Sequence, residues 1–158
     1  MSRTPMSELG KFGGKMDELF LVLKKAFPGD MDLEKYHDKL SAARKVNPRM
    51  VCEGFMNIVK MPIETGNPQS ELYLHRIMMG DDTFFVGLDV QQIVDPNYHA
   101  LIEKITQLWL GMSEGSQSAV KRYLQILVTR GALATKDELS LGVLNEFRAA
   151  QGKPLLRA

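Results

Sequence analysis

The sequence predicts an all-α protein: one compact domain of about six or seven helices, preceded by a flexible N-terminal arm. Apolar residues recur at the i, i+3, i+4 spacing of amphipathic helices along most of the chain. Asn-Pro and Asp-Pro pairs mark three positions where a helix can begin. The stretch "TFFVGLDV" holds residues that favour strands, but no second segment offers it a partner strand.

The composition agrees with a single globular domain. Of the 158 residues, 44% are hydrophobic and 25% are charged, and a chain of this length buries enough surface to fold without a metal ion or a disulfide. With 20 basic and 19 acidic residues, the net charge is +1. That balance argues against broad binding to a polyanion and permits only a local basic face.

Residues 1–15 predict the arm. They combine several glycines, serines and threonines with few apolar residues, so they offer no face to bury. The helical domain is then expected over 16–158. Three basic residues of the arm are candidates for contact with a partner: Arg3, Lys11 and Lys15.

Apolar periodicity begins at Met16 and predicts a first helix that ends at "PGD", residues 28–30. A second helix is predicted over 31–46, with Asp30 or Asp32 as its N-cap. Further helices should begin at the prolines of three pairs, because the Asn or Asp side chain accepts a bond from an unpaired amide and proline has no amide of its own. These pairs are Asn47-Pro48, Asn67-Pro68 and Asp95-Pro96.

Pro62, Gly80 and Gly111 should end these three helices in turn. Two more helices follow. One is predicted over 114–130, with Ser113 as its N-cap and Gly131 closing it. The last should begin at a capping box formed by Thr135 and Glu138.

Residues 81–94 are predicted as a loop with a short helix at 89–94. Asp81 and Asp82 do not have the spacing of a calcium loop, and adjacent side chains tend to diverge. We expect these carboxylates to bond nearby amides and turn the chain. The turn should direct aromatic side chains into the core, and four are assigned there: Phe84, Phe85, Trp109 and Tyr123.

No catalytic, cofactor-binding or metal-binding residue is predicted. The three histidines are not paired at helical spacing, and Cys52 stands between apolar neighbours in a predicted helix. The chain lacks the G-x-S-x-G elbow and the phosphate-loop pattern. The prediction is therefore a non-enzyme, with an acidic site at Asp81 and Asp82 as the enzymatic alternative.

Two groups of residues point to binding. Methionine packs adaptably at contact surfaces, which makes a set near two predicted turns candidates for protein contact: Met61, Pro62, Met78 and Met79. Short basic clusters on a helix can contact phosphates. The nucleic-acid alternative rests on one such set: Lys121, Arg122 and Arg130.

The order of features resembles that of small helical proteins from nucleocytoplasmic large DNA viruses. The residues that carry the resemblance are "NPRMVCEGFMNIVKMP" (47–62), "MGDDTFFVGLD" (79–89) and "LIEKITQLWLGMSEGSQSAVKRYLQILV" (101–128). The chain departs from the pattern by inserting "IETGNPQSELYLHRI" where a tighter Pro-Tyr connection is expected. The resemblance implies a viral origin and carries over no catalytic residue.

Taken with that resemblance, the sequence predicts a non-enzymatic structural or adaptor protein, such as a minor capsid or cement protein, whose partners are other proteins of the particle. A lone cysteine suits a reducing compartment, so we expect the virion or the host cytoplasm. The first residues lack a signal-peptide core, which predicts that the protein is not secreted. No apolar run reaches 18 residues, so no membrane span is expected.

Overall fold

The protein is all-α, as the sequence predicts. The computed structural model describes residues 7–64, 66–67, 69–86, 88–93 and 95–157. Within these ranges there is no strand, and the one extended pairing is an isolated bridge between Pro62 and Leu72. The helices are α1 (Glu8–Ala26), α2 (Met31–Val46), α3 (Pro48–Val59), α4 (Tyr73–Met79), α5 (Thr83–Val86), the 3₁₀ turn η1 (Val90–Gln92), α6 (Pro96–Trp109), α7 (Glu114–Thr135) and α8 (Glu138–Ala150).

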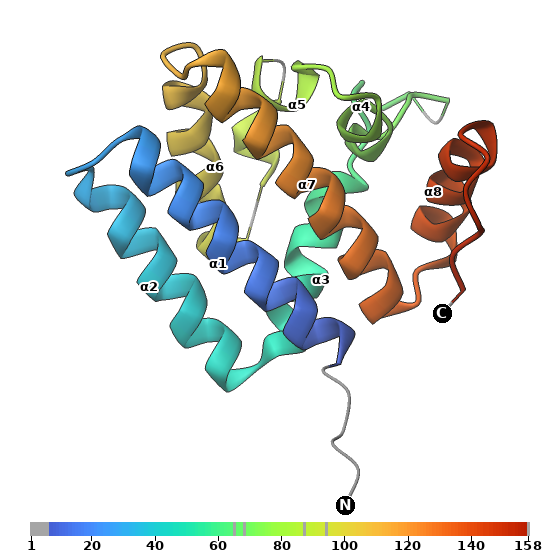
Figure 1. Cartoon of the computed structure of the whole chain (residues 1–158), viewed down its shortest axis with the longest axis horizontal. Coiled ribbons are helices and arrows are strands. Elements are labelled where there is room, and N and C mark those ends of the chain that lie inside the picture. Colours follow the sequence, from blue (N-terminus) through green and yellow to red (C-terminus); the bar gives the residue numbers. More distant parts are fainter. Residues whose placement is uncertain (1–6, 65, 68, 87, 94, 158) are drawn as a thin grey trace, which may run out of the picture.

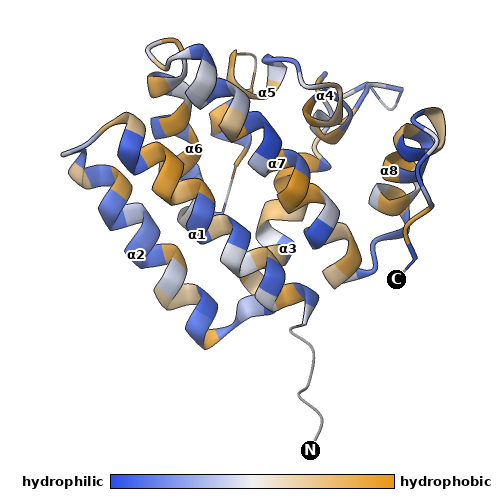
Figure 2. Ribbon diagram, viewed as in Figure 1, coloured by the Kyte–Doolittle hydropathy of each residue, from blue (hydrophilic) through white to orange (hydrophobic). Residues whose placement is uncertain are grey.

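Two long helices form the centre of the molecule. Figure 1 shows α1 and α7 side by side, with α2 along the outer side of α1 and α8 at the opposite edge. Helix α2 is mostly hydrophilic in Figure 2, and its buried side chains are Leu33 and Leu40. No helix in the described part of the chain combines the length and the apolarity that crossing a bilayer requires.

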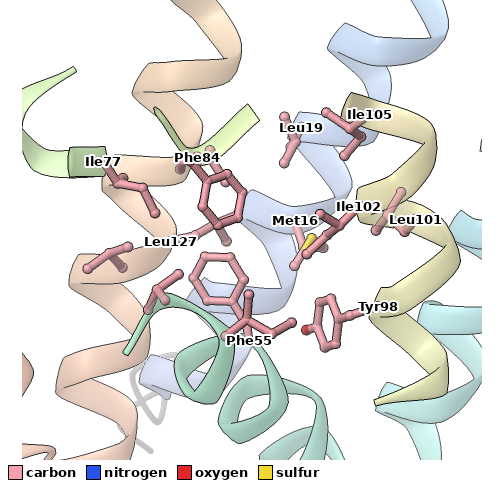
Figure 3. Packing of buried hydrophobic residues seen from close by; sticks show 14 of the residues in the cluster. Met16, Leu19, Phe55, Ile77, Phe84, Tyr98, Leu101, Ile102, Ile105 and Leu127 are labelled. Atoms are coloured by element: carbon pink, nitrogen blue, oxygen red, sulfur yellow. The ribbon is translucent and has the colours of Figure 1, made fainter. Parts of the chain in front are cut away.

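The core lies where α1, α3, α5, α6 and α7 meet. Figure 3 shows Met16, Phe55, Phe84 and Tyr98 converging there from four of these helices. The aromatic prediction is confirmed for three residues, because Phe84, Phe85 and Trp109 are all buried. Phe85 stacks on Trp109 with ring centroids 3.8 Å apart. Tyr123 is half-buried and packs against the core cluster, while its hydroxyl donates to Glu18 at 3.2 Å, so this side chain lies at the edge of the core.

The predicted arm is too long. Helix α1 begins at Glu8, so residues 8–15 are helical, and Arg3 lies outside the described residues. One glycine of this stretch, Gly13, serves packing. A Cβ at position 13 would lie 2.8 Å from Cδ of Arg44, whose guanidinium donates to the Gly13 carbonyl at 2.9 Å. Glycine therefore lets α2 approach the backbone of α1.

Helices start where predicted at Pro48 and Pro96. Residue 68 lies outside the described residues, and after it no helix begins before Tyr73, the first residue of α4. Helix α4 begins later because the chain first doubles back. The amide of Ile63 donates to the carbonyl of Glu71 at 2.8 Å, and Asn67 accepts from the amide of Gln69 at 3.0 Å. Asn67 thus closes a turn instead of capping a helix.

Two boundaries near the C-terminus also differ. Helix α7 continues past Gly131 to Thr135 and ends where Lys136 adopts φ 54°. The predicted capping box is wrong, because Asp137 is the N-cap of α8 and accepts from the amide of Ser140 at 2.9 Å. The Thr135 hydroxyl donates back to the Gly131 carbonyl at 2.8 Å instead.

The segment 81–94 holds two single turns. Helix α5 occupies the Phe84 and Phe85 region, and η1 falls within the short helix predicted at 89–94. Asp81 accepts from the amide of Thr83 at 2.9 Å, which is the turn bond expected of it.

Candidate functional site

An open groove lies between α7 and α8, and we call it the α7–α8 groove. Its volume is about 470 Å³, within the usual range for a binding site. Met78 at the end of α4 contributes to its floor, and the segment after α8 forms a third wall beside the two helices. Figure 1 shows α8 set apart from α7 at its upper end, with the C-terminal segment running back beside it.

Helical spacing places the lining residues on two facing stripes. Along α7 the stripe includes Arg122, Ile126, Arg130 and Leu133. Along α8 it includes Leu144, Phe147 and Arg148, which follow the i, i+3, i+4 rule. The short turn between Thr135 and Glu138 brings these two stripes opposite one another.

The C-terminal wall is held by hydrogen bonds. Asn145 clamps Leu156, accepting from its amide at 2.7 Å and donating to its carbonyl at 3.2 Å. The Arg148 guanidinium donates to the carbonyl of Pro154 at 2.6 Å. These bonds fix Leu156 and Lys153 along the groove.

The groove is cationic at its edges and apolar on its floor. Four basic residues line it, and none of the described lining residues is acidic. A carboxylate of α1 reaches the rim, where Glu8 pairs with Arg130 at 3.3 Å. The floor consists of half-buried apolar side chains: Met78, Ile126, Leu133, Phe147 and Leu156.

This arrangement suits binding better than catalysis. The Thr129 hydroxyl in the groove donates to the carbonyl of Gln125, so it is held by the backbone. Its cations are guanidinium and ammonium groups, which donate hydrogen bonds and accept none.

The structure brings three of the predicted site residues together and separates the others. Met78, Arg122 and Arg130 come together in the groove although they were predicted for two different functions. Lys121 lies elsewhere, paired with Asp82 at 2.6 Å and 5.9 Å from the centre of the Trp109 ring. The nucleic-acid set therefore does not form one surface of unpaired cations.

The other candidates for protein contact are dispersed. Met61 and Pro62 lie in the loop that doubles back before α4. Met79 is 57% exposed and is not among the residues that line the groove. Lys11 and Lys15 belong to α1 and pair with Glu8 and Glu18.

The two adjacent aspartates do not converge. Asp81 pairs with Arg76 at 3.2 Å, while Asp82 pairs with Lys121. Burial works to raise the pKa of Asp81, but the bonds from Thr83 and Arg76 outweigh it and hold that pKa below its usual range. A lowered pKa favours an ionised turn residue over a general acid at neutral pH.

Sequence reasoning missed a polar cluster between α1 and α2. His37 is bonded at both ring nitrogens, to Asp17 at 2.8 Å and to Lys24 at 2.7 Å, and its ring stacks on Phe20. Arg44 completes the cluster by donating to Asp17 at 2.9 Å. Because both nitrogens are engaged, His37 has none left for a substrate, and the cluster joins two helices.

Asp17 is ionised by this setting. Burial alone would raise its pKa, but hydrogen bonds and charges from His37 and Arg44 together lower the pKa of the carboxyl. Its negative charge pairs with the Arg44 guanidinium, while Lys24, the other cation at this junction, pairs with Glu34 at 3.5 Å.

Cys52 is fully buried in α3, where burial, aided by Glu53, raises the pKa of the thiol to about 12. The thiolate is then scarce near neutral pH, so this thiol is a poor nucleophile. No three histidine, cysteine, aspartate or glutamate residues in the described ranges are placed to hold a metal ion.

Comparison with known proteins yields no protein family, no curated protein and no solved structure that matches the chain.

Proposed function

We propose that this protein is a non-enzymatic adaptor that binds a partner protein in the α7–α8 groove. The observation that carries the proposal is the groove itself, with its apolar floor and its basic edges. An apolar floor gains free energy when a partner covers it, and the charged edges select the partner and its orientation.

The resemblance to small helical proteins of large DNA viruses suggests the setting. We propose a virion-associated role, in which the chain acts as a minor capsid or cement protein or as an adaptor in the host cytoplasm. Proteomics of purified particles tests this setting. The protein should be found at many copies in each particle, and its repeated absence would count against a virion role while leaving the adaptor proposal intact.

Site-specific photocrosslinking tests the adaptor proposal. A photoreactive amino acid is introduced at Gln151, an exposed residue that lines the groove, and at Ala42, an exposed residue of α2 that serves as the control. The variant at Gln151 should form a discrete adduct with one partner protein in the native cells. The variant at Ala42 should not form that adduct.

Equal adducts at both positions, or none at Gln151, would contradict the proposal. The partner identified from the adduct should then bind the purified protein directly. A variant with Ile126→Asp in the groove floor should bind that partner less tightly, because a charge on the floor must be desolvated on contact.

A further inference from the structure

We infer that the α7–α8 groove receives an acidic amphipathic helix of the partner protein. The inference rests on the proposed function and makes it more specific, since it names the chemistry and the conformation of the bound segment. Charge, apolar area and the shape of the walls each support one part of it.

The positive charges of the groove favour a bound segment that carries acidic residues. Its four cations come from three parts of the chain: Arg122 and Arg130 from α7, Arg148 from α8, and Lys153 from the segment that follows. The net charge of the whole chain is only +1, so this concentration is local. A ring of like charges attracts carboxylates and repels basic segments.

The pairing of Arg130 with Glu8 shows how a carboxylate sits at this rim. Glu8 reaches the guanidinium from α1 at 3.3 Å. Arg122 is exposed at the N-terminal end of the stripe, and Arg148 lines the groove from α8, where its Nε donates to the carbonyl of Pro154. We expect acidic residues of the bound segment to pair with Arg122 and Arg148.

The apolar floor favours a bound segment that also carries apolar residues. Ile126 and Leu133 are half-buried, lie outside the hydrophobic core cluster and line the groove. Phe147 and Leu156 face them from the other side. Apolar area of this kind is covered best by side chains that project from one face of the incoming segment.

The walls favour a helical segment. Two of the walls are the surfaces of α7 and α8, and within the described ranges there is no sheet edge to which an extended peptide could add a strand. The stripe from Arg122 to Leu133 is about 17 Å long at the rise of an α-helix. A bound helix of about 12 residues, three turns, would match that length.

Selection from a peptide library tests the inference even while the partner is unidentified. Random peptides of about 16 residues, one turn longer than the groove, are displayed on phage and selected on the immobilised full chain. The recovered pool should become acidic, with apolar residues at the i, i+3, i+4 spacing. The best peptide should gain helicity on binding, measured by circular dichroism.

Charge reversal locates the binding. The double variant Arg122→Glu with Arg148→Glu should bind the selected peptide at least about tenfold less tightly in a fluorescence anisotropy titration, since two attractive pairs become repulsive. Replacing glutamate by glutamine in the peptide should weaken binding to the original chain in the same direction. The control is Lys35→Glu with Lys45→Glu, two exposed residues of α2 with the same change in net charge. This control should leave binding within about twofold, because distant surface charges are largely screened.

The milder variant Arg122→Gln with Arg148→Gln keeps the test valid if charge reversal disturbs the fold. The circular dichroism of this variant should match that of the original chain. Its affinity for the selected peptide should still be severalfold lower. If the folded variant binds the selected peptide as tightly as the original chain does, the inference is overturned.

Other outcomes also overturn it. They are a neutral or basic recovered pool, no recovery at all, equal binding of the glutamine peptide, or tighter groove binding by a single-stranded oligonucleotide than by the peptide. A selected peptide that matches this chain's own sequence would assign the groove to a second copy. The proposed function fails separately, through loss of the specific adduct at Gln151, so the two failures can be told apart.

Discussion

At the scale of single residues, Gly54 governs how closely α3 and α6 approach. A Cβ at this position would lie 2.5 Å from Oδ2 of Asp95 and 3.1 Å from Cε2 of Tyr98. The Tyr98 ring cannot retreat without cost, because it is 2% exposed and its hydroxyl donates to the carbonyl of Val51 at 2.6 Å. The missing side chain at position 54 therefore preserves a buried hydrogen bond between two helices.

We predict that Gly54→Ala lowers the free energy of unfolding by about 1–3 kcal/mol, because overpacking outweighs the gain in helix propensity. Gly142→Ala is the matched control. Gly142 is exposed on α8 with open space where its Cβ would be, so alanine should raise stability by up to about 1 kcal/mol. Urea unfolding followed by circular dichroism measures both. Equal stabilisation of the two variants would show that the approach of Tyr98 is not a constraint.

At the scale of secondary-structure elements, identical dipeptides have different roles. Asn47 precedes α3 and accepts from the amide of Met50 at 3.1 Å, which is a true N-cap bond. Asn67 accepts from the amide of Gln69 in a loop whose two ends pair through the bridge between Pro62 and Leu72. The Asn-Pro pair predicts an Asn that bonds a nearby amide, while the contacts around it decide whether a helix follows.

We predict that Asn47→Ala costs about 1 kcal/mol of unfolding free energy, the usual value of a helix cap. Asn67→Ala should cost less, because the turn that it closes is exposed and is also held by the bond from Ile63 to Glu71. The same urea titration compares the two variants. If Asn67→Ala proved the more costly, the loop before α4 would contribute more to stability than its exposure implies.

The sequence predicted what is local and missed what depends on distant contacts. Amphipathic spacing was enough for the long helices, because burial of one face follows from the pattern itself. The helical role of Gly13 depends on Arg44 of another helix, and that of Gly131 depends on Met56, whose Sδ would lie 2.5 Å from an added Cβ. Neither approach leaves a mark in the adjacent sequence, so sequence spacing alone favours a flexible segment at Gly13 and a helix end at Gly131.

Only the α7 side of the candidate groove could be predicted from the sequence. Arg122 and Arg130 recur along one face of a helix, with Ile126 between them, so a mixed basic and apolar stripe could be recognised in the sequence. Arg148 and Lys153 join them because the chain reverses at Lys136 and again after α8. Those reversals are set by packing and by the Asn145 clamp, which sequence spacing does not encode.

At the scale of the whole molecule, the helices differ in how far they are enclosed. Helix α1 contacts α2, α3 and α7, whereas α8 contacts mainly α7 and α4 and stands at the edge in Figures 1 and 2. Its first turn is held by Asp137, which caps the helix and pairs with Lys60 at 3.2 Å. An element with fewer buried contacts opens at a lower free energy than the centre of the molecule.

We therefore predict that amides of α8 exchange hydrogen at least about fivefold faster than those of α1 and α7, measured by mass spectrometry. Asp137→Ala should speed exchange in α8 by about a further fivefold, since removing a cap costs about 1 kcal/mol, and should leave α1 unchanged. Asp89→Ala is the control, because Asp89 caps only the short turn η1. Equal protection of α8 and α1 would mean that the groove has two rigid walls. Faster exchange in α8 alone would mean that a partner binds against one firm wall, α7, and orders the other.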